Sequence, residues 1–170
     1  MQLDWLGEHR QIVGDFYRSA NRYSQICNLA AFGEKIRFSP YEIQIMEHIL
    51  EHGEENRNMK WYASQLGLHQ ATYSKYINRL VSKGLLDKYH AEGNQKDVIL
   101  RVSEAGLEEY RKYAEFARGE LFSELLEYLD SLNPEQLEAV RHTFEIWGRA
   151  HARTPSPPPV RKPVCLIKIK

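Results

Sequence analysis

The chain has 170 residues, of which 42% are hydrophobic and 27% charged, and its 23 basic residues balance its 23 acidic ones. This length is enough for one domain with accessory helices, and no apolar run is long enough to span a membrane. Acidic residues interrupt residues 1–15, unlike a secretory signal sequence, and two cysteines do not make a disulfide framework. We therefore expect a cytoplasmic protein that does not contact a membrane.

The zero net charge hides a segregation of charge along the chain. Residues 59–101 hold 7 basic and 3 acidic side chains, and residues 153–170 hold 5 basic and no acidic ones. By contrast, residues 102–152 hold 5 basic and 11 acidic side chains. A basic segment on an acidic body indicates contact with phosphate groups, although a chance sorting of surface charge explains the pattern equally well.

Two helices are predicted in the first third of the chain. Residues 3–33 form an amphipathic helix, because apolar side chains recur there at steps of three and four. A second helix is predicted to begin at Pro40, after the cap Ser39, and to run to about His52. Glu42 stands three residues after Ser39 and completes a capping box.

A helix-turn-helix and a basic β-hairpin are predicted next. Asn58 caps the first helix, Gly67 breaks it, and Gly84 ends the second helix. The expected helices and strands lie at residues 59–66, 70–83, 85–90 and 98–102, with a polar loop at residues 91–96. Such a unit can hold its second helix in the DNA major groove, with the hairpin along the flanking phosphates and minor groove.

Two further helices are predicted towards the C-terminus. Ser103 caps a long helix to about Leu132, and Asn133 begins a last helix that runs to about His151. This last helix is expected to bury Leu137, Val140, Phe144, Ile146 and Trp147. The long terminal helices carry more apolar surface than a small central domain can cover. We therefore expect a two-fold homodimer with its recognition helices about 34 Å apart.

Several short motifs resemble those of the MarR family of bacterial transcriptional regulators. They are Ala63, Leu66-Gly67-Leu68, Thr72, Ser74-Lys75, Arg79-Leu80, Lys83-Gly84-Leu85 and Leu100-Arg101-Val102-Ser103-Glu104-Ala105-Gly106. The predicted elements also follow the family's order, and the resemblance spans about residues 8–151. It implies a mainly α-helical chain with a small β-hairpin wing, in which a winged helix-turn-helix domain is flanked by N- and C-terminal dimerisation helices.

The predicted domain organisation follows from the elements and the resemblance. It comprises an N-terminal dimerisation helix at residues 1–38, the DNA-binding domain at 39–102, C-terminal dimerisation helices at 103–152 and a tail at 153–170. Proline density predicts that this basic tail is disordered. It either adds phosphate contacts or is an unselected extension.

The predicted recognition helix carries the candidates for contact with base edges. Tyr73, Ile77 and Leu80 mark its buried stripe, and polar residues occupy the other faces. The base-contact candidates are Gln70, Thr72, Ser74, Lys75 and Asn78, because amide, hydroxyl and ammonium groups can pair with base edges. The phosphate and wing candidates are Lys60, Arg79, Lys88, Gln95 and Lys96.

The sequence departs from the family pattern at two places. The family's wing tip carries an acidic residue followed by two arginines, whereas Asn94-Gln95-Lys96 stands here. Lysine lacks the planar fork of arginine, which weakens the expected wing contact. His69 replaces the usual Asp or Ser and is a poorer helix cap.

An effector crevice between the dimerisation helices and the winged domain is implied by the resemblance, with small aromatic or lipophilic acids as ligands. The candidate lining residues are Trp5, Tyr17, Arg18, Arg22, Tyr41 and Trp61, with either arginine as the carboxylate partner. Plain core packing is the alternative explanation for these aromatic residues.

The sequence predicts neither a redox site nor a metal site. Cys27 lies among apolar residues without a nearby cation, so we expect a buried structural thiol rather than an oxidant sensor. His48 and His52 have a spacing that suits zinc, but metal-responsive relatives hold their histidine pair on the helix after the wing. We therefore expect two exposed histidines at a helix end, no metal and no cofactor.

The function predicted from the sequence is that of a homodimeric DNA-binding regulator, usually a repressor, which binds double-stranded DNA at a pseudo-palindromic operator. No phosphate-binding loop, dinucleotide-binding turn or nucleophile elbow is present, so an enzyme is not expected. Two alternatives remain: a winged-helix protein-interaction module without sequence-specific DNA binding, and an architectural protein that binds DNA without base preference.

Overall fold

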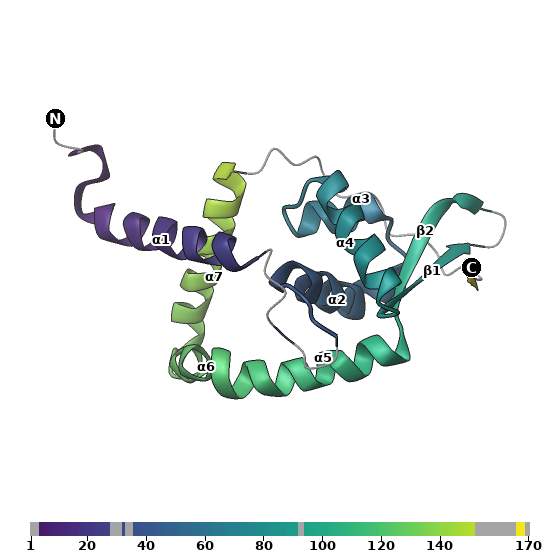
Figure 1. Cartoon of the computed structure of the whole chain (residues 1–170). Helices are drawn as coiled ribbons and strands as arrows, with labels where there is room; N and C mark the ends of the chain where they lie inside the picture. The colour runs from purple at the N-terminus through teal and green to yellow at the C-terminus, as the bar shows by residue number, and fades with distance from the viewer. Residues whose placement is uncertain (1–3, 28–31, 33–35, 92–93, 152–165, 169–170) are drawn as a thin grey trace.

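The computed structural model describes residues 4–27, 32, 36–91, 94–151 and 166–168 (Figure 1). A winged domain occupies one side of the molecule, and α5 runs beneath it towards α6. From there α7 rises to cross α1 (Figure 1). The helices are α1 (Arg10–Ile26), α2 (Pro40–His52), α3 (Met59–Gln65), α4 (Gln70–Ser82), α5 (Glu104–Phe116), α6 (Ser123–Asp130) and α7 (Pro134–His151). This mainly helical architecture with a β-hairpin wing confirms the predicted fold class.

The sheet of the wing has three strands in the order β2-β1-β3. The strands are β1 (Leu86–Ala91), β2 (Asn94–Val102) and β3 (Leu166–Lys168). Strand β2 begins earlier than predicted, at Asn94, which pairs with Ala91 although both were expected in the loop, and the register shifts between His90 and Ala91. Strand β3 pairs antiparallel with β1, opposite Tyr89 to Ala91.

The prediction of a disordered tail is therefore wrong for residues 166–168. Strand β1 pairs with β2 along one edge, so its second edge exposes backbone groups that an extended segment can satisfy. The rest of the predicted tail, apart from residues 166–168, lies outside the described residues.

Both long terminal helices are shorter than predicted. A short 3₁₀ segment, Asp4–His9, precedes α1, and Gly7 interrupts it with a φ of 50°, a conformation that glycine accepts. The helix expected after the wing breaks at Phe122, which has a φ of −119°. There a π turn over Ala117–Leu121 separates α5 from α6, and Gly119, a weak helix former, lies inside that turn.

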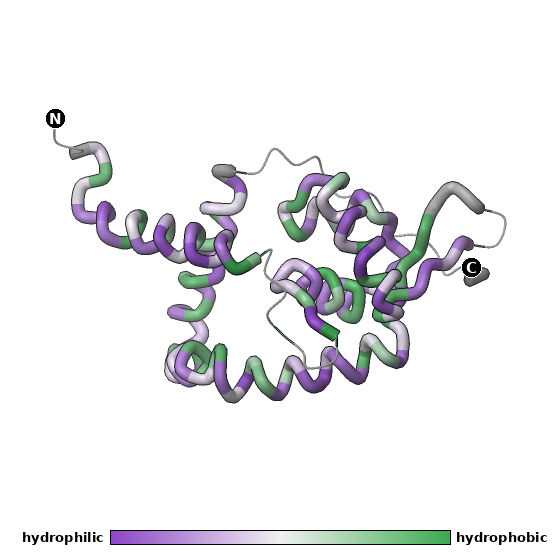
Figure 2. The backbone as a smooth tube through the Cα atoms, in the orientation of Figure 1, coloured by the Kyte–Doolittle hydropathy of each residue, from purple (hydrophilic) through white to green (hydrophobic). Residues whose placement is uncertain are grey.

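The main buried hydrophobic cluster lies in the winged domain, and side chains of α5 pack against it. Side chains from α2, α3, α4 and the wing strands form one buried cluster, and the predicted stripe of Tyr73, Ile77 and Leu80 is buried within it. Neither α1 nor α6 contains a buried residue. Polar and apolar residues alternate along α1, α5 and α7 (Figure 2). None of the described helices is both long and apolar enough to cross a membrane.

The last helix does not bury the apolar residues that were expected to be buried. Leu137, Phe144 and Ile146 are 44%, 61% and 51% exposed in the single chain. Trp147 instead packs against Phe16 of α1, with ring centroids 4.0 Å apart, and this contact joins the two terminal helices. The exposed apolar side chains of α7 are therefore not covered by other described residues of the same chain.

Helix α5 is joined to the winged domain at its first turn. The Ser103 hydroxyl accepts a hydrogen bond from the Gly106 amide (3.0 Å) and donates one to the Gly84 carbonyl (2.6 Å). Gly106 must lack a side chain, because a Cβ there would lie 2.2 Å from the Leu85 carbonyl oxygen. The close approach lets α5 continue directly from β2.

A buried carboxylate ties α2 to the end of α4. The Glu42 side chain is fully buried, and Oε2 accepts a hydrogen bond from the Ser39 amide (2.8 Å), which confirms the predicted capping box. Its Oε1 accepts a hydrogen bond from Lys83 Nζ (2.8 Å) and lies 3.5 Å from Arg79 Nε. Lys83 also donates to the Arg37 carbonyl (2.6 Å). The cap of one helix thus anchors the C-terminal end of the other.

Replacing Glu42 should destabilise this junction. We expect Glu42→Gln to lower the free energy of unfolding by about 2 kcal/mol, because hydrogen bonds to a charged group are lost while Lys83 and Arg79 keep partial contact with water. Urea unfolding at matched protein concentration measures the change, with Glu47→Gln on the same helix as control. Equal midpoints for the two variants would contradict the prediction.

Candidate DNA-binding surface

Helix α4 is held with one face on the core and its N-terminal end outward. The turn before it is closed by a hydrogen bond from the Leu68 amide to the Ala63 carbonyl (2.9 Å), and Gly67 adopts a φ of 63°. His69 does cap the helix, since its Nδ1 accepts a hydrogen bond from the Ala71 amide (3.3 Å). An imidazole nitrogen thus supplies the cap acceptor that the sequence pattern assigned to Asp or Ser.

The base-contact candidates lie on the faces of α4 that the core does not use. Gln70, Lys75 and Asn78 are exposed, whereas Thr72 and Ser74 are half-buried. Gln70, Ser74 and Asn78 follow one another at four-residue steps and therefore share one stripe of the helix. This stripe offers amide and hydroxyl groups, with the Lys75 ammonium beside it.

A polar contact links the wing to the recognition helix. Lys88 of β1 donates a hydrogen bond from Nζ to Asn78 Oδ1 (2.8 Å). The contact puts a wing cation beside the polar stripe, and it also means that Asn78 must exchange a partner before it can pair with a base. The sequence did not reveal this contact, because the two residues lie on different elements.

The residues predicted to contact phosphate groups differ in their exposure and in the contacts that they already make. Lys60 is exposed on α3, but the Arg79 guanidinium lies over the Tyr76 ring at 5.6 Å and beside Glu42. Arg79 therefore takes part in the junction, while its side chain remains 38% exposed. The backbones of Gln95 and Lys96 lie in β2, and their side chains fall outside the described part of the chain.

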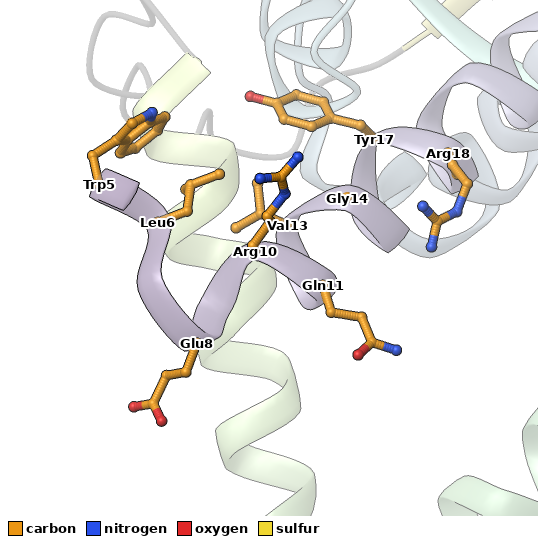
Figure 3. Close-up of a pocket in the computed structure, with 9 residues that line it drawn as sticks. All are labelled: Trp5, Leu6, Glu8, Arg10, Gln11, Val13, Gly14, Tyr17 and Arg18. Carbon is orange, nitrogen blue, oxygen red and sulfur yellow. The ribbon is translucent and has the colours of Figure 1, made fainter. Parts of the chain in front are cut away.

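Three of the six effector-pocket candidates line a common depression. It has a volume of about 760 Å³ at the start of α1 and is lined by Trp5, Leu6, Glu8, Arg10, Gln11, Val13, Gly14, Tyr17 and Arg18 (Figure 3). The other three do not meet there. Tyr41 packs against Tyr76, with ring centroids 5.3 Å apart, Trp61 packs against His48, and Arg22 is exposed on α1.

Two arginines, Arg10 and Arg18, line this depression, and of these only Arg18 was predicted. Arg18 forms an ion pair with Asp15, and Figure 3 shows its guanidinium directed away from the aromatic rings. Arg10 instead points between Trp5 and Tyr17 (Figure 3). Its position seven residues before Tyr17 places both on one helix face, a spacing that sequence analysis overlooked.

Cys27 is buried, as expected for a structural thiol. It is 1% exposed, and burial raises the pKa of the thiol, while hydrogen bonds with Tyr41 and Tyr23 act in the opposite direction. Burial also raises the pKa of the nearby Glu47 carboxyl, whose hydrogen bond from the Tyr110 hydroxyl (3.2 Å) opposes this shift. These groups lie where α1, α2 and α5 meet.

The prediction of two exposed histidines is wrong. His48 and His52 are both half-buried against Trp61, with ring centroids 5.4 and 5.2 Å from the indole. His52 is also hydrogen-bonded to Glu55 of the short 3₁₀ turn Gly53–Glu55, which follows α2. An i, i+4 spacing places two side chains on one face but does not reveal which element covers them.

No protein-family model and no curated protein matches the chain. Solved structures do match it. A MarR/EmrR family transcriptional regulator from Acinetobacter sp. ADP1 is 14% identical, covers 84% of this chain and 95% of its own, and has a TM-score of 0.61. BpsR of Bordetella bronchiseptica, whose DNA binding is regulated by 6-hydroxynicotinic acid, is 17% identical over 81% of this chain and 98% of its own, with a TM-score of 0.58.

A third similar structure is the DNA complex of MepR from S. aureus, 14% identical over 88% of this chain and 96% of its own, with a TM-score of 0.55. Each of the three covers more than four-fifths of this chain. Such low identities compare folds rather than residues. The chain therefore has the fold of MarR-family transcriptional regulators.

Proposed function

We propose that the protein is a homodimeric, DNA-binding transcriptional repressor that acts in the cytoplasm. The observation that carries this proposal is the exposed polar stripe of α4, with the Lys88 ammonium of the wing hydrogen-bonded to it. Both belong to the basic segment 59–101. In this reading α4 enters the major groove, and Lys60 and Lys88 position it through the phosphates.

A direct binding experiment tests the function. Fluorescence anisotropy compares the chain's own upstream intergenic DNA with a scrambled duplex at two salt concentrations. Tight binding to the upstream duplex alone supports an operator-binding repressor. Equal, steeply salt-dependent binding to both favours an architectural protein, because phosphate contacts carry no sequence information. No binding to either favours the winged-helix interaction module.

Lys75 should contribute directly to operator binding. It is exposed on α4 beside the polar stripe, so Lys75→Ala should weaken operator binding by about 1–3 kcal/mol if the ammonium pairs with a base edge. Lys112→Ala on α5, where the lysine pairs with Glu108 and Glu109, is the matched control and should bind as wild type. Identical isotherms for wild type and Lys75→Ala would remove Lys75 from the contact surface.

The homodimer is proposed because the terminal helices expose apolar side chains on the single chain. The exposed large residues include Ile12, Leu125, Leu126, Tyr128, Leu137, Phe144 and Ile146. They belong to α1, α6 and α7, outside the winged domain (Figure 1). Large apolar side chains gathered on exposed helices are typical of a protein interface, and a second copy of the chain would cover them symmetrically.

Sedimentation should therefore find a particle of twice the chain mass of 19.9 kDa. Phe144→Glu should shift the equilibrium to the monomer, because a carboxylate would have to be desolvated in the interface. Glu145→Gln, at the next position of the same helix, is the control and should remain dimeric. A monomeric wild-type chain at micromolar concentration would contradict the proposal.

We further propose that the depression at the start of α1 binds a small aromatic acid. Trp5 and Tyr17 provide aromatic surface, and the Arg10 guanidinium between them suits a carboxylate (Figure 3). Because α1 also packs on α7 through Phe16 and Trp147, a ligand there would shift the terminal helices and with them the spacing of the recognition helices. Effector and DNA affinities would then be coupled reciprocally.

The probe for this site is 6-hydroxynicotinic acid, which regulates DNA binding of the structurally similar BpsR. Arg10→Gln should weaken its binding by about 1.5–3 kcal/mol, the contribution of a hydrogen bond to a charged group. Arg18→Gln should have no effect, because Arg18 is engaged with Asp15. Calorimetric titration measures both, and equal affinities of the two variants would contradict the assignment of Arg10.

A further inference from the structure

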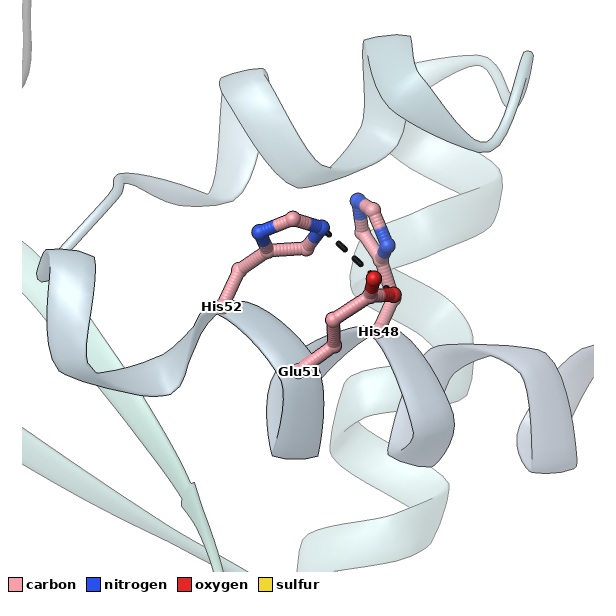
Figure 4. A group of neighbouring side chains, drawn as sticks. All are labelled: His48, Glu51 and His52. Carbon is pink, nitrogen blue, oxygen red and sulfur yellow. Dashed lines mark ion pairs between the residues drawn. The ribbon is translucent and has the colours of Figure 1, made fainter.

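The C-terminal end of α2 gathers two imidazoles and a carboxylate. His48, Glu51 and His52 each place a potential ligand atom within 4.8 Å of the others (Figure 4). Positions separated by three and four residues lie on the same face of a helix, so the backbone itself brings the groups together. The order His-x-x-Glu-His also occurs in one class of zinc metallopeptidase, where the two histidines, four residues apart on a helix, bind the ion.

His52 is oriented as a metal ligand usually is. Its Nδ1 lies 2.9 Å from Glu55 Oε1, and Glu55 Oε2 in turn accepts a hydrogen bond from Arg57 Nε (2.9 Å). A carboxylate on one ring nitrogen fixes the tautomer and leaves the other nitrogen as the electron-pair donor. That other nitrogen, Nε2, faces Glu51 Oε2 at 3.6 Å (Figure 4).

His48 is held in place by packing. Its ring stacks on the Trp61 indole at an interplanar angle of 8°, and it meets the His52 ring edge-on, with centroids 4.5 Å apart. Its Nε2 is buried and has no hydrogen-bond partner among the described residues. The imidazole is therefore positioned by aromatic contacts rather than by a hydrogen bond at Nε2.

We propose that His48, Glu51 and His52 bind a divalent transition-metal ion of the Zn²⁺ type. Two imidazoles and one carboxylate suit such ions, whereas Mg²⁺ and Ca²⁺ prefer oxygen ligands alone. Metal–ligand bonds of about 2.0–2.1 Å require ligand atoms closer together than 4.8 Å. The Glu51 side chain is 72% exposed and its Oε2 already lies 3.6 Å from His52 Nε2, so a small rotation can bring the carboxylate onto the ion. Water completes the coordination.

The ion would stabilise the packing of α3, the first helix of the helix-turn-helix, on the end of α2. The Tyr62 hydroxyl of α3 donates a hydrogen bond to the His52 carbonyl (3.2 Å), and Trp61 of α3 packs on both imidazoles. A metal ion that links two turns of α2 would therefore fix the support on which α3, the first helix of the motif, rests. The site is separate from the α1 depression and does not depend on the proposed repressor function.

Co²⁺ and Zn²⁺ titrations of the full chain test the site. Visible absorption follows Co²⁺ binding and calorimetry follows Zn²⁺, and we expect one saturable site per chain. Glu51→Gln and His52→Ala should abolish it, and Glu55→Gln should weaken it about 10–100-fold through loss of the carboxylate behind His52. Glu54→Gln, an exposed neighbour outside the cluster, is the matched control and should bind as wild type.

Tryptophan fluorescence gives a local readout, because Trp61 lies beside the site. Paramagnetic Co²⁺ should quench part of the emission of wild type and of Glu54→Gln, but not that of Glu51→Gln. Glu51 is exposed, so its replacement leaves the fold intact even if His52→Ala does not. Absence of saturable binding to wild type, or wild-type affinity in Glu51→Gln and His52→Ala, would overturn the proposal.

Discussion

The buried carboxylate of Glu42 is the constraint on which the winged domain depends. It caps α2 through the Ser39 amide and accepts from Lys83 at the end of α4, so two helices share one fully desolvated charge. Removing a single partner from such a pair leaves a charge without compensation, which makes the junction sensitive to substitution. The orientation of α4, and with it the proposed DNA-reading face, is set from its C-terminal end.

The terminal helices, unlike the winged domain, are held by few buried contacts within the single chain. The winged domain contains its own core, but α1 and α6 bury no residue in the single chain. The contact between Phe16 and Trp147 joins the N- and C-terminal helices without covering their outer faces. A winged domain with its own core, joined to terminal helices that are largely exposed, suits the proposed control by a ligand. Such a ligand need only favour one arrangement of the terminal helices over others.

Some elements and side-chain roles could be predicted directly from local patterns. The Ser39 capping box and the buried stripe of Tyr73 on α4 are confirmed, because each depends on residues within one or two turns. The break at Phe122 and the strand at Leu166–Lys168 were missed. Neither the π turn nor the pairing of a distant segment leaves a periodic pattern in the residues that form it.

The sequence by itself determined the order of the helices and strands from α1 to β2, the family resemblance and the basic character of the helix-turn-helix. Only the tertiary structure decided which side chains meet. In the folded chain Arg79 lies beside Glu42, and Arg10 rather than Arg18 lies between the aromatic rings of Trp5 and Tyr17. Glu55 is hydrogen-bonded to His52. The physical reason is that helical periodicity fixes the face on which a residue lies, whereas its partner is fixed by how separate elements pack.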